Sequence, residues 1–196
     1  MSEDSHIWEK FKNAEDSALS MIYSQHVDFL FGYGRKFSDD EDFIFDTIQD
    51  LFYYLITNRK NLGEVKNIKL YLLKSLQRRL ILELEKKQKQ TKRNNDYHTE
   101  PEIVFPAEEN LIRDEEEQAQ LELIRQGMQQ LNSKQREALY YKYTCGFSYQ
   151  QICEIMSVSY DTARQLVSRA VGSLKKTLGR DFLTLFFILK KEAFLF

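Results

Sequence analysis

Both prolines of this 196-residue chain lie in one short segment, and this placement constrains the fold more than any other feature. They are Pro101 and Pro106, and only seven glycines are spread over the whole chain. Proline and glycine are the residues that most often end helices, so long helices are expected on either side of this segment. Apolar residues recur at helical spacing in both halves. The sequence therefore predicts an all-α protein with two helical domains joined by a linker.

The first half is expected to be a helical bundle. Amphipathic patterns begin near Ile7 and continue through residues 19–30, 43–58 and 66–89. Gly32 and Gly34 are expected to loosen the end of the second helix, and the acidic run 38–41 suits the start of the third. The polar segment 58–67 is typical of a loop.

The predicted organisation has four parts: a first domain at residues 1–92, a linker at 93–110, a second domain at 111–180 and an apolar tail at 181–196. Lys190, Lys191 and Glu192 interrupt the tail, which is too short to span a bilayer. We expect it to form an extra helix that packs on the second domain. The polar N-terminus does not resemble a signal peptide, so a cytoplasmic protein without membrane insertion is expected.

Charge is segregated along the chain. Residues 38–50 hold six acidic residues and no basic one, residues 60–93 hold eleven basic against three acidic, and residues 100–117 hold eight acidic and one arginine. Such blocks favour separate charged partners, although a solvated helix face also explains each of them. An internal contact between the last two blocks is a further hypothesis from charge.

An enzyme is not expected. The sequence has no glycine-rich phosphate loop, no nucleophile paired with a base and no spacing typical of metal ligands. Cys145 and Cys153 fit neither a zinc pattern nor a disulfide framework, and His26 on an apolar face is best explained as structural. We therefore expect no catalytic residue, no metal and no cofactor.

The strongest local pattern is a helix-turn-helix in residues 148–178. Ser148 and Gln151 form a capping box before a short helix, Val158 lies in a tight turn, and Ser159 caps a second helix that starts at Tyr160. In this motif the second helix enters the major groove of DNA. A plain helical hairpin with a solvated face is the alternative.

The second helix has an apolar side and a polar side. Ala163, either Leu166 or Val167, Ala170 and Leu174 are expected to pack inward. Arginine can bond guanine with two hydrogen bonds, glutamine can bond adenine, and hydroxyls suit phosphates. The residues expected to contact DNA are Tyr160, Thr162, Arg164, Gln165, Ser168 and Arg169.

These segments resemble a known family. One part of the sequence looks like region four of extracytoplasmic-function (ECF) RNA polymerase sigma factors. This part consists of the stretch 148–156, the pair Val158 and Ser159, and the stretch 162–174. Residues 131–143 resemble the preceding helix, and residues 46–52 and 69–72 resemble motifs of region two. The resemblance covers roughly residues 8–178. Ser157 stands where the family usually has glycine, and Leu166 and Arg78 also depart from the family's usual residues.

The resemblance implies roles for three groups of residues. Asp46, Gln49 and Asp50, which share one helix face by their spacing, would dock on a coiled coil of the polymerase largest subunit. The helix at 160–169 would read the −35 element. The loop and basic helix would read and open the −10 element through Arg59, Lys60, Asn61, Lys66, Asn67, Lys69, Lys74, Arg78 and Arg79. Tyr71 is better explained as a core residue.

The resemblance also implies partners: core RNA polymerase, promoter DNA and, as is frequent in this class, an anti-sigma factor. The implied function is that of an alternative sigma factor. A stand-alone helix-turn-helix regulator is the main alternative, and it predicts tight binding to an operator, usually as a symmetric dimer. A helical adaptor that binds only proteins is the second, and it predicts that Arg164 and Arg169 are dispensable.

Overall fold

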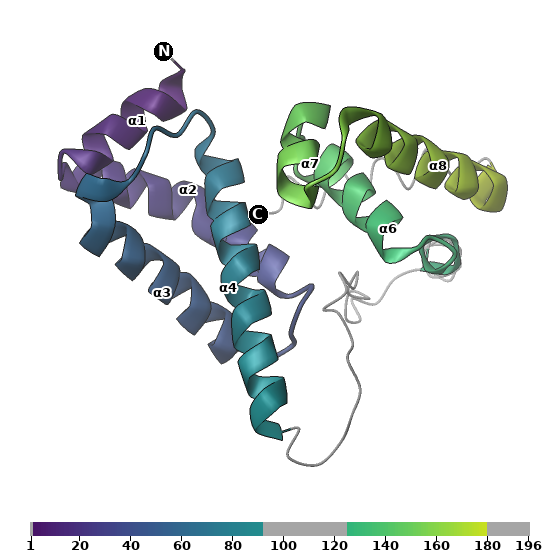
Figure 1. The fold of residues 1–196 in the computed structure, drawn as a ribbon, viewed down its shortest axis with the longest axis horizontal. Coiled ribbons are helices and arrows are strands. Elements are labelled where there is room, and N and C mark those ends of the chain that lie inside the picture. Colours follow the sequence, from purple (N-terminus) through teal and green to yellow (C-terminus); the bar gives the residue numbers. More distant parts are fainter. Residues whose placement is uncertain (1, 92–124, 180–196) are drawn as a thin grey trace, which may run out of the picture. The chain divides into compact units, whose positions relative to one another are not determined.

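The computed structural model describes residues 2–91 and 125–179 as helices and the loops between them, which confirms the all-α prediction. The chain divides into two compact units, Met1–Val104 and Phe105–Phe196 (Figure 1). The expected linker at 93–110 and apolar tail at 181–196 lie outside the described residues. Within the described residues, none of the helices combines the length and the apolar character that crossing a membrane requires.

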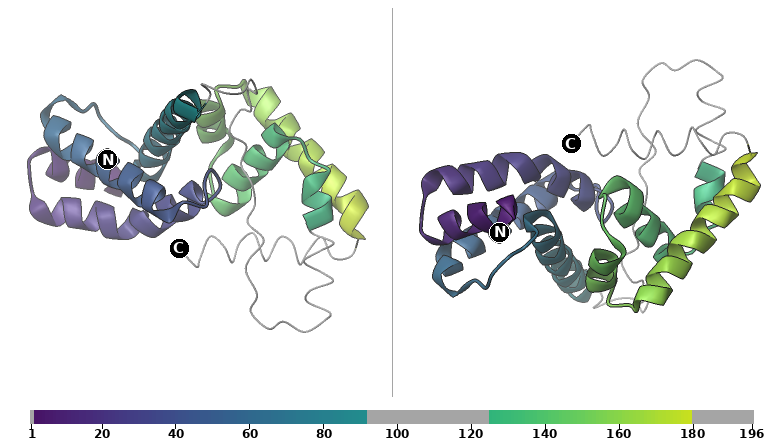
Figure 2. Two further views of the ribbon diagram at one scale, coloured as in Figure 1. Left: turned by 90° about the horizontal axis from the view of Figure 1, so that it is seen from below. Right: turned by 90° about the horizontal axis from the view of Figure 1, so that it is seen from above.

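Four α-helices build the first unit: α1 (Glu3–Lys12), α2 (Asp16–Gly34), α3 (Glu41–Asn58) and α4 (Ile68–Thr91), with a short 3-10 helix η1 (Arg59–Asn61) after α3. Helix α4 packs on both α2 and α3, and α1 packs on α2 (Figures 1 and 2). The largest fully buried side chains come from all four α-helices, among them Trp8, Ile22, Ile44 and Leu72. One shared core therefore holds the unit together.

The helix starts follow local chemistry. Ser2 accepts a hydrogen bond from the backbone N–H of Ser5 at the start of α1. Asp40 accepts one from Phe43 (3.0 Å) at the start of α3. Two acidic residues stand in the first turn of each helix, where the helix dipole favours negative charge. The hydrogen bonds from Phe43 and from the Lys87 ammonium lower the pKa of Asp40.

The sequence predicts that Gly34 loosens the end of helix α2. In the structure this glycine instead allows two helices to pack closely. It is the last residue of the helix and is buried against α3. A Cβ atom placed on Gly34 would lie 2.4 Å from Cγ2 of Ile44, which is closer than van der Waals contact allows. The glycine is needed here because α2 and α3 approach each other at this point.

We therefore expect Gly34→Ala to lower the free energy of unfolding of the first unit by about 1–3 kcal/mol, the usual cost of overpacking. Urea unfolding followed by circular dichroism measures this change. Gly63→Ala is the matched control, since a Cβ there meets no atom within 4 Å. Equal stability of the Gly34→Ala and Gly63→Ala proteins would contradict the close-approach argument.

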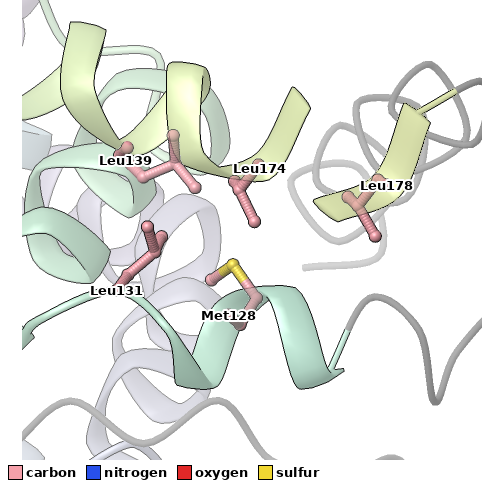
Figure 3. Close-up of a cluster of buried hydrophobic side chains, with 6 residues drawn as sticks. Met128, Leu131, Leu139, Leu174 and Leu178 are labelled. Atoms are coloured by element: carbon pink, nitrogen blue, oxygen red, sulfur yellow. The ribbon is translucent and has the colours of Figure 1, made fainter. Parts of the chain in front are cut away.

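The second unit contains α6 (Ser133–Leu139), a π-helical turn η2 (Tyr140–Thr144), α7 (Tyr149–Met156) and α8 (Tyr160–Leu178), preceded by a helical stretch at residues 125–129. One cluster of buried apolar side chains joins this stretch to α6 and α8 (Figure 3): Met128, Leu131, Leu139, Ala170, Leu174 and Leu178. The cluster fixes the C-terminal part of α8 and leaves its N-terminal part to the contact with α7.

Asn132 caps α6. Its side chain accepts from the backbone N–H of Gln135 (2.9 Å), whose own side chain accepts from the N–H of Asn132 (3.0 Å). The helix expected to reach residue 143 changes to a π-helical turn after Leu139. Tyr140 and Tyr141 are both buried there, so the wider turn places two consecutive aromatic rings in the core.

Candidate functional site

Helices α7 and α8 and the turn between them form the predicted helix-turn-helix. The capping box of Ser148 and Gln151 is present at the start of α7. Ser157 ends α7 in the left-handed conformation (φ 54°, ψ 45°), a backbone state that glycine adopts most easily. The turn therefore keeps the left-handed geometry although a serine occupies this position. Ser159 then caps α8 through the N–H of Thr162 (3.2 Å).

The two sides of α8 differ as the sequence predicted. Ala163, Val167, Ala170 and Leu174 are buried, whereas Leu166 is half-buried, so Val167 is the inward residue of that pair. All six residues expected to contact DNA are exposed: Tyr160, Thr162, Arg164, Gln165, Ser168 and Arg169. The helix thus presents two guanidinium groups, an amide, two aliphatic hydroxyls and a phenol to solvent over its first three turns.

Two further side chains, which the sequence had not indicated as functional, lie beside the start of α8. The ring of Tyr149 meets the ring of Tyr160 edge-on, with centroids 5.8 Å apart. The ammonium of Lys142 lies 4.7 Å from the centre of the Tyr149 ring, and it also donates to the carbonyl of Phe147 (3.3 Å). Tyr149 directly follows the residue that caps α7 and lies outside the buried face of that helix. This position is the feature of the sequence that could have identified Tyr149 as a surface residue.

The acidic residues of α3 form the second candidate surface. Asp46, Gln49 and Asp50 are all exposed, while Thr47 and Ile48 between them are buried. The spacing argument for one shared face is therefore consistent with their exposure.

Beside this acidic face lies an open, mainly apolar groove of about 520 Å³ between α2 and α3, which the sequence did not reveal. Eight residues line it: Asp16, Leu19, Ser20, Tyr23, Gln49, Phe52, Tyr53 and Ile56. Tyr53 is 69% exposed and Ile56 is 38% exposed, which is unusual for large apolar side chains on a packed helix. Gln49 belongs to both the groove and the acidic face, so the two features form one continuous surface.

The short helix η1, the loop after it and the helix α4 carry the nine residues predicted to contact the −10 element. Lys60, Asn61 and Lys66 are exposed in the loop region. Lys74 and Arg78 are exposed one turn apart on α4. These five side chains present four positive charges and one amide to solvent.

The other four residues of the group are partly engaged within the first unit. Asn67 caps α4, because its side-chain oxygen accepts from the N–H of Leu70 (2.7 Å). The ammonium of Lys69 lies 4.1 Å from the centre of the Phe29 ring, and the guanidinium of Arg79 lies 5.0 Å from that of Tyr54. Arg59 is half-buried. These contacts hold Asn67, Lys69 and Arg79 in defined positions.

Tyr71 belongs to an aromatic cluster but is itself half-buried, so its interpretation as a core residue holds only in part. Its ring meets that of Trp8 edge-on at 5.0 Å, and the Trp8 ring in turn lies 5.3 Å from that of Phe11. Burial raises the pKa of the Tyr71 phenol. The cluster fills the space between α1 and α4.

His26 is half-buried on α2, and burial is the largest cause of the lowered pKa of its imidazole. Lys69 lowers this pKa further, while Asp4 opposes both effects. Because the unfolded chain binds the proton more tightly than the folded one, the free energy of unfolding should fall as the pH drops below about 6.5. Above that pH the histidine is neutral in both states and contributes no pH dependence.

Urea unfolding of the wild type and of His26→Gln between pH 7.5 and pH 5.5 measures this contribution. We expect the unfolding midpoint of the wild type to fall with acidification more steeply than that of the variant, which has no group to titrate at this position. Parallel pH profiles would show that His26 binds its proton equally well in both states.

The described residues contain no cluster of three or more His, Cys, Asp or Glu side chains arranged to hold a metal ion. Cys145 is buried and Cys153 half-buried, and they are not joined in a disulfide. The described surfaces offer charged groups, hydrogen-bonding groups and aromatic rings for recognition.

Comparisons with known proteins agree with this arrangement. Residues 121–174 match the family described as Sigma-70, region 4. The search of curated proteins gave no match. Two solved structures with the same fold are the sigma factor RpoE in complex with the anti-sigma factor NepR from Bartonella quintana, and CnrH in complex with the cytosolic domain of CnrY.

The RpoE comparison has a TM-score of 0.55 at 20% sequence identity, covering 85% of this chain and 97% of RpoE. The CnrH comparison has a TM-score of 0.59 at 14% identity, covering 92% of this chain and 99% of CnrH. Residues 121–174 therefore belong to the sigma-70 region 4 family, and the chain shares the fold of the sigma factor RpoE and of CnrH, in agreement with the resemblance seen in the sequence.

Proposed function

We propose that this chain is an alternative sigma factor, which directs core RNA polymerase to specific promoters and opens the −10 element. The observation that carries the proposal is the sigma-70 region 4 match over a helix-turn-helix whose second helix exposes Arg164, Gln165 and Arg169. Such a factor acts by binding, not by catalysis of its own, which agrees with the family of this domain. Its place of action would be the cytoplasm, where polymerase and promoter DNA are found.

In this proposal α8 reads the −35 element. Its exposed N-terminal half would enter the major groove, with Arg164 and Gln165 at base edges and the hydroxyls of Thr162 and Ser168 near phosphates. Tyr160 and Tyr149 would contribute apolar contact at the edge of the groove, where thymine methyl groups are accessible.

The loop 59–67 and helix α4 would read and open the −10 element. Opening a duplex costs a few kcal/mol per unstacked base, and a protein offsets this cost by trapping the freed bases and neutralising the backbone. Lys60, Lys66, Lys74 and Arg78 are exposed along this part of the unit and supply the cations. Asn61 is the exposed amide available for contact with a base edge.

The acidic face of α3 and the groove beside it would bind core polymerase. Asp46, Gln49 and Asp50 provide charge and hydrogen-bond acceptors, and Tyr53 and Ile56 provide apolar area. This combination of an apolar centre and a charged rim is typical of protein interfaces.

An anti-sigma factor is a further proposed partner. RpoE was crystallised with the anti-sigma factor NepR, and CnrH was solved with the cytosolic domain of CnrY. By analogy of fold, a protein of this kind would hold the present chain inactive by covering the surfaces that bind polymerase.

A selection experiment separates the proposal from a stand-alone regulator. A random duplex library is incubated with the chain alone and with the chain plus bacterial core polymerase, and the bound sequences are read. We expect enrichment of one two-part sequence only when polymerase is present. Enrichment of a palindrome by the chain alone would instead establish a stand-alone regulator, which binds duplex DNA as a dimer.

A further inference from the structure

Helix α1 is joined to one short segment far along the sequence by three hydrogen bonds. The indole N–H of Trp8 donates to the carbonyl oxygen of Gly63 (2.9 Å). The carboxylate of Asp4 accepts from the backbone N–H of Ile68 (2.8 Å). The hydroxyl of Ser2 donates to the carbonyl oxygen of Lys66 (3.3 Å). All three partners fall within residues 63–68, which are the end of the loop that precedes α4 and the first residue of that helix (Figure 1).

The donor on Trp8 is held rigidly. Its side chain is 1% exposed and lies in the aromatic cluster with Phe11 and Tyr71. A buried indole N–H needs a partner, because leaving it without one costs about 1–3 kcal/mol. Gly63 itself is exposed, so the hydrogen bond connects the fixed core to the backbone of a surface loop.

Asp4 acts on the other end of the segment. The first N–H groups of a helix have no partner within the helix, and a negative charge beside them is favoured by the helix dipole. At the start of α4, Asp4 accepts from the N–H of Ile68 and Asn67 accepts from that of Leu70. Helix α1 therefore supplies one of two caps that fix where the loop ends and α4 begins.

We propose that α1 is a positioning element for the loop 59–67, and that Trp8 and Asp4 are its positioning residues. The inference rests on the proposed function, in which this loop captures the −10 strand. A loop that is free in solution loses conformational entropy when it binds, about 1–2 kcal/mol for each backbone residue that becomes fixed. By ordering the loop in advance, α1 reduces this cost at the moment when the bases leave the duplex.

The test compares promoter opening by holoenzymes that contain wild-type, Trp8→Phe or Asp4→Ala protein. Phenylalanine keeps an aromatic ring in the core and removes the N–H donor together with part of the indole ring, and Phe11→Leu, which also shortens a buried side chain, controls for the lost packing. Opening is followed by the fluorescence of 2-aminopurine in the −10 element, on a duplex promoter and on one whose −10 bases are already unpaired by mismatches. Phe11→Leu is the control, since it weakens the same aromatic cluster without a polar contact to the loop.

We expect Trp8→Phe and Asp4→Ala to slow opening of the duplex promoter about five- to tenfold, the size of one hydrogen bond. Binding to the unpaired promoter should weaken by a similar factor, because the loop must be ordered there too, while binding to polymerase stays unchanged; Phe11→Leu should resemble the wild type on both promoters. Unchanged opening by both variants would overturn the proposal. An equal loss on both promoters together with weaker polymerase binding would also overturn it, because that pattern reveals a structural role only.

Hydrogen exchange on the free protein tests the positioning claim without any promoter. The amides of residues 62–67 should exchange faster in Trp8→Phe than in the wild type and in Phe11→Leu. If the wild type opened no promoter with polymerase, the proposed function would fail, and the exchange rates would still decide whether α1 orders the loop. Equal exchange in all three proteins would refute the ordering itself.

Discussion

Asp50→Lys is expected to weaken binding of the chain to core RNA polymerase about thirtyfold or more. Asp50 is exposed on α3 beside Asp46 and Gln49, next to the apolar groove. Reversal of a charge within a complementary interface places like charges together, and about 2 kcal/mol of lost binding free energy corresponds to thirtyfold in affinity. Because the side chain is exposed, the fold should be unaffected. Fluorescence anisotropy of the labelled chain titrated with polymerase measures the affinity.

Asp28→Lys is the matched control for this experiment. Asp28 is exposed on α2, on a side of that helix that does not line the groove, and its reversal changes the net charge by the same amount. We expect this variant to bind polymerase within about twofold of the wild type, the scale of a rim charge. If both reversals weakened binding equally, the effect would be one of total charge, and the assignment of the α3 face would be wrong.

Arg164→Ala is expected to reduce transcription from promoters with an intact −35 element about 10- to 100-fold. Arg164 is exposed in the N-terminal half of α8, and an arginine that forms two hydrogen bonds with guanine contributes about 1–3 kcal/mol to discrimination between bases. Alanine has the highest helix propensity, so α8 should remain intact. Run-off transcription with saturating polymerase measures the loss.

Lys176→Ala removes the same charge near the C-terminal end of α8, where the side chain is also exposed. This variant should lose only the small contribution of one distant cation to DNA attraction. Equal losses in the two variants would show that α8 attracts DNA through charge alone and reads no sequence. Full activity of Arg164→Ala would favour the adaptor, for which this arginine is dispensable.

The sequence predicted best what depends on neighbouring residues. The capping box of Ser148 and Gln151 and the cap of Ser159 involve residues three apart, so local rules are sufficient to find them. The exposure of the polar side of α8 and of Asp46 and Asp50 follows from the helical period in the same way. The proposed roles of these residues remain predictions, since no bound partner is present.

What the sequence did not predict depends on contacts between distant residues. The hydrogen bond from Trp8 to Gly63 joins residues 55 positions apart, and the one from Ile68 to Asp4 joins residues 64 apart. No local pattern encodes such pairs. The same holds for the close approach at Gly34 and for the groove beside α3, because each arises only when two helices pack together.

Where this chain departs from the residue that the family usually has, the local backbone conformation could be determined only from the structure. Ser157 raised the possibility of a different turn, yet the left-handed conformation is kept there. The energetic cost of that conformation for a residue with a side chain is modest, about 1–2 kcal/mol, and the packing of α7 on α8 is able to offset it.

Transcription from a random promoter library by core RNA polymerase supplied with this chain tests the central claim most directly. The account predicts new start sites that appear only when the chain is added, each preceded by the same pair of sequence elements at −35 and −10. Absence of new start sites with a well-folded chain that also fails to bind polymerase would contradict it.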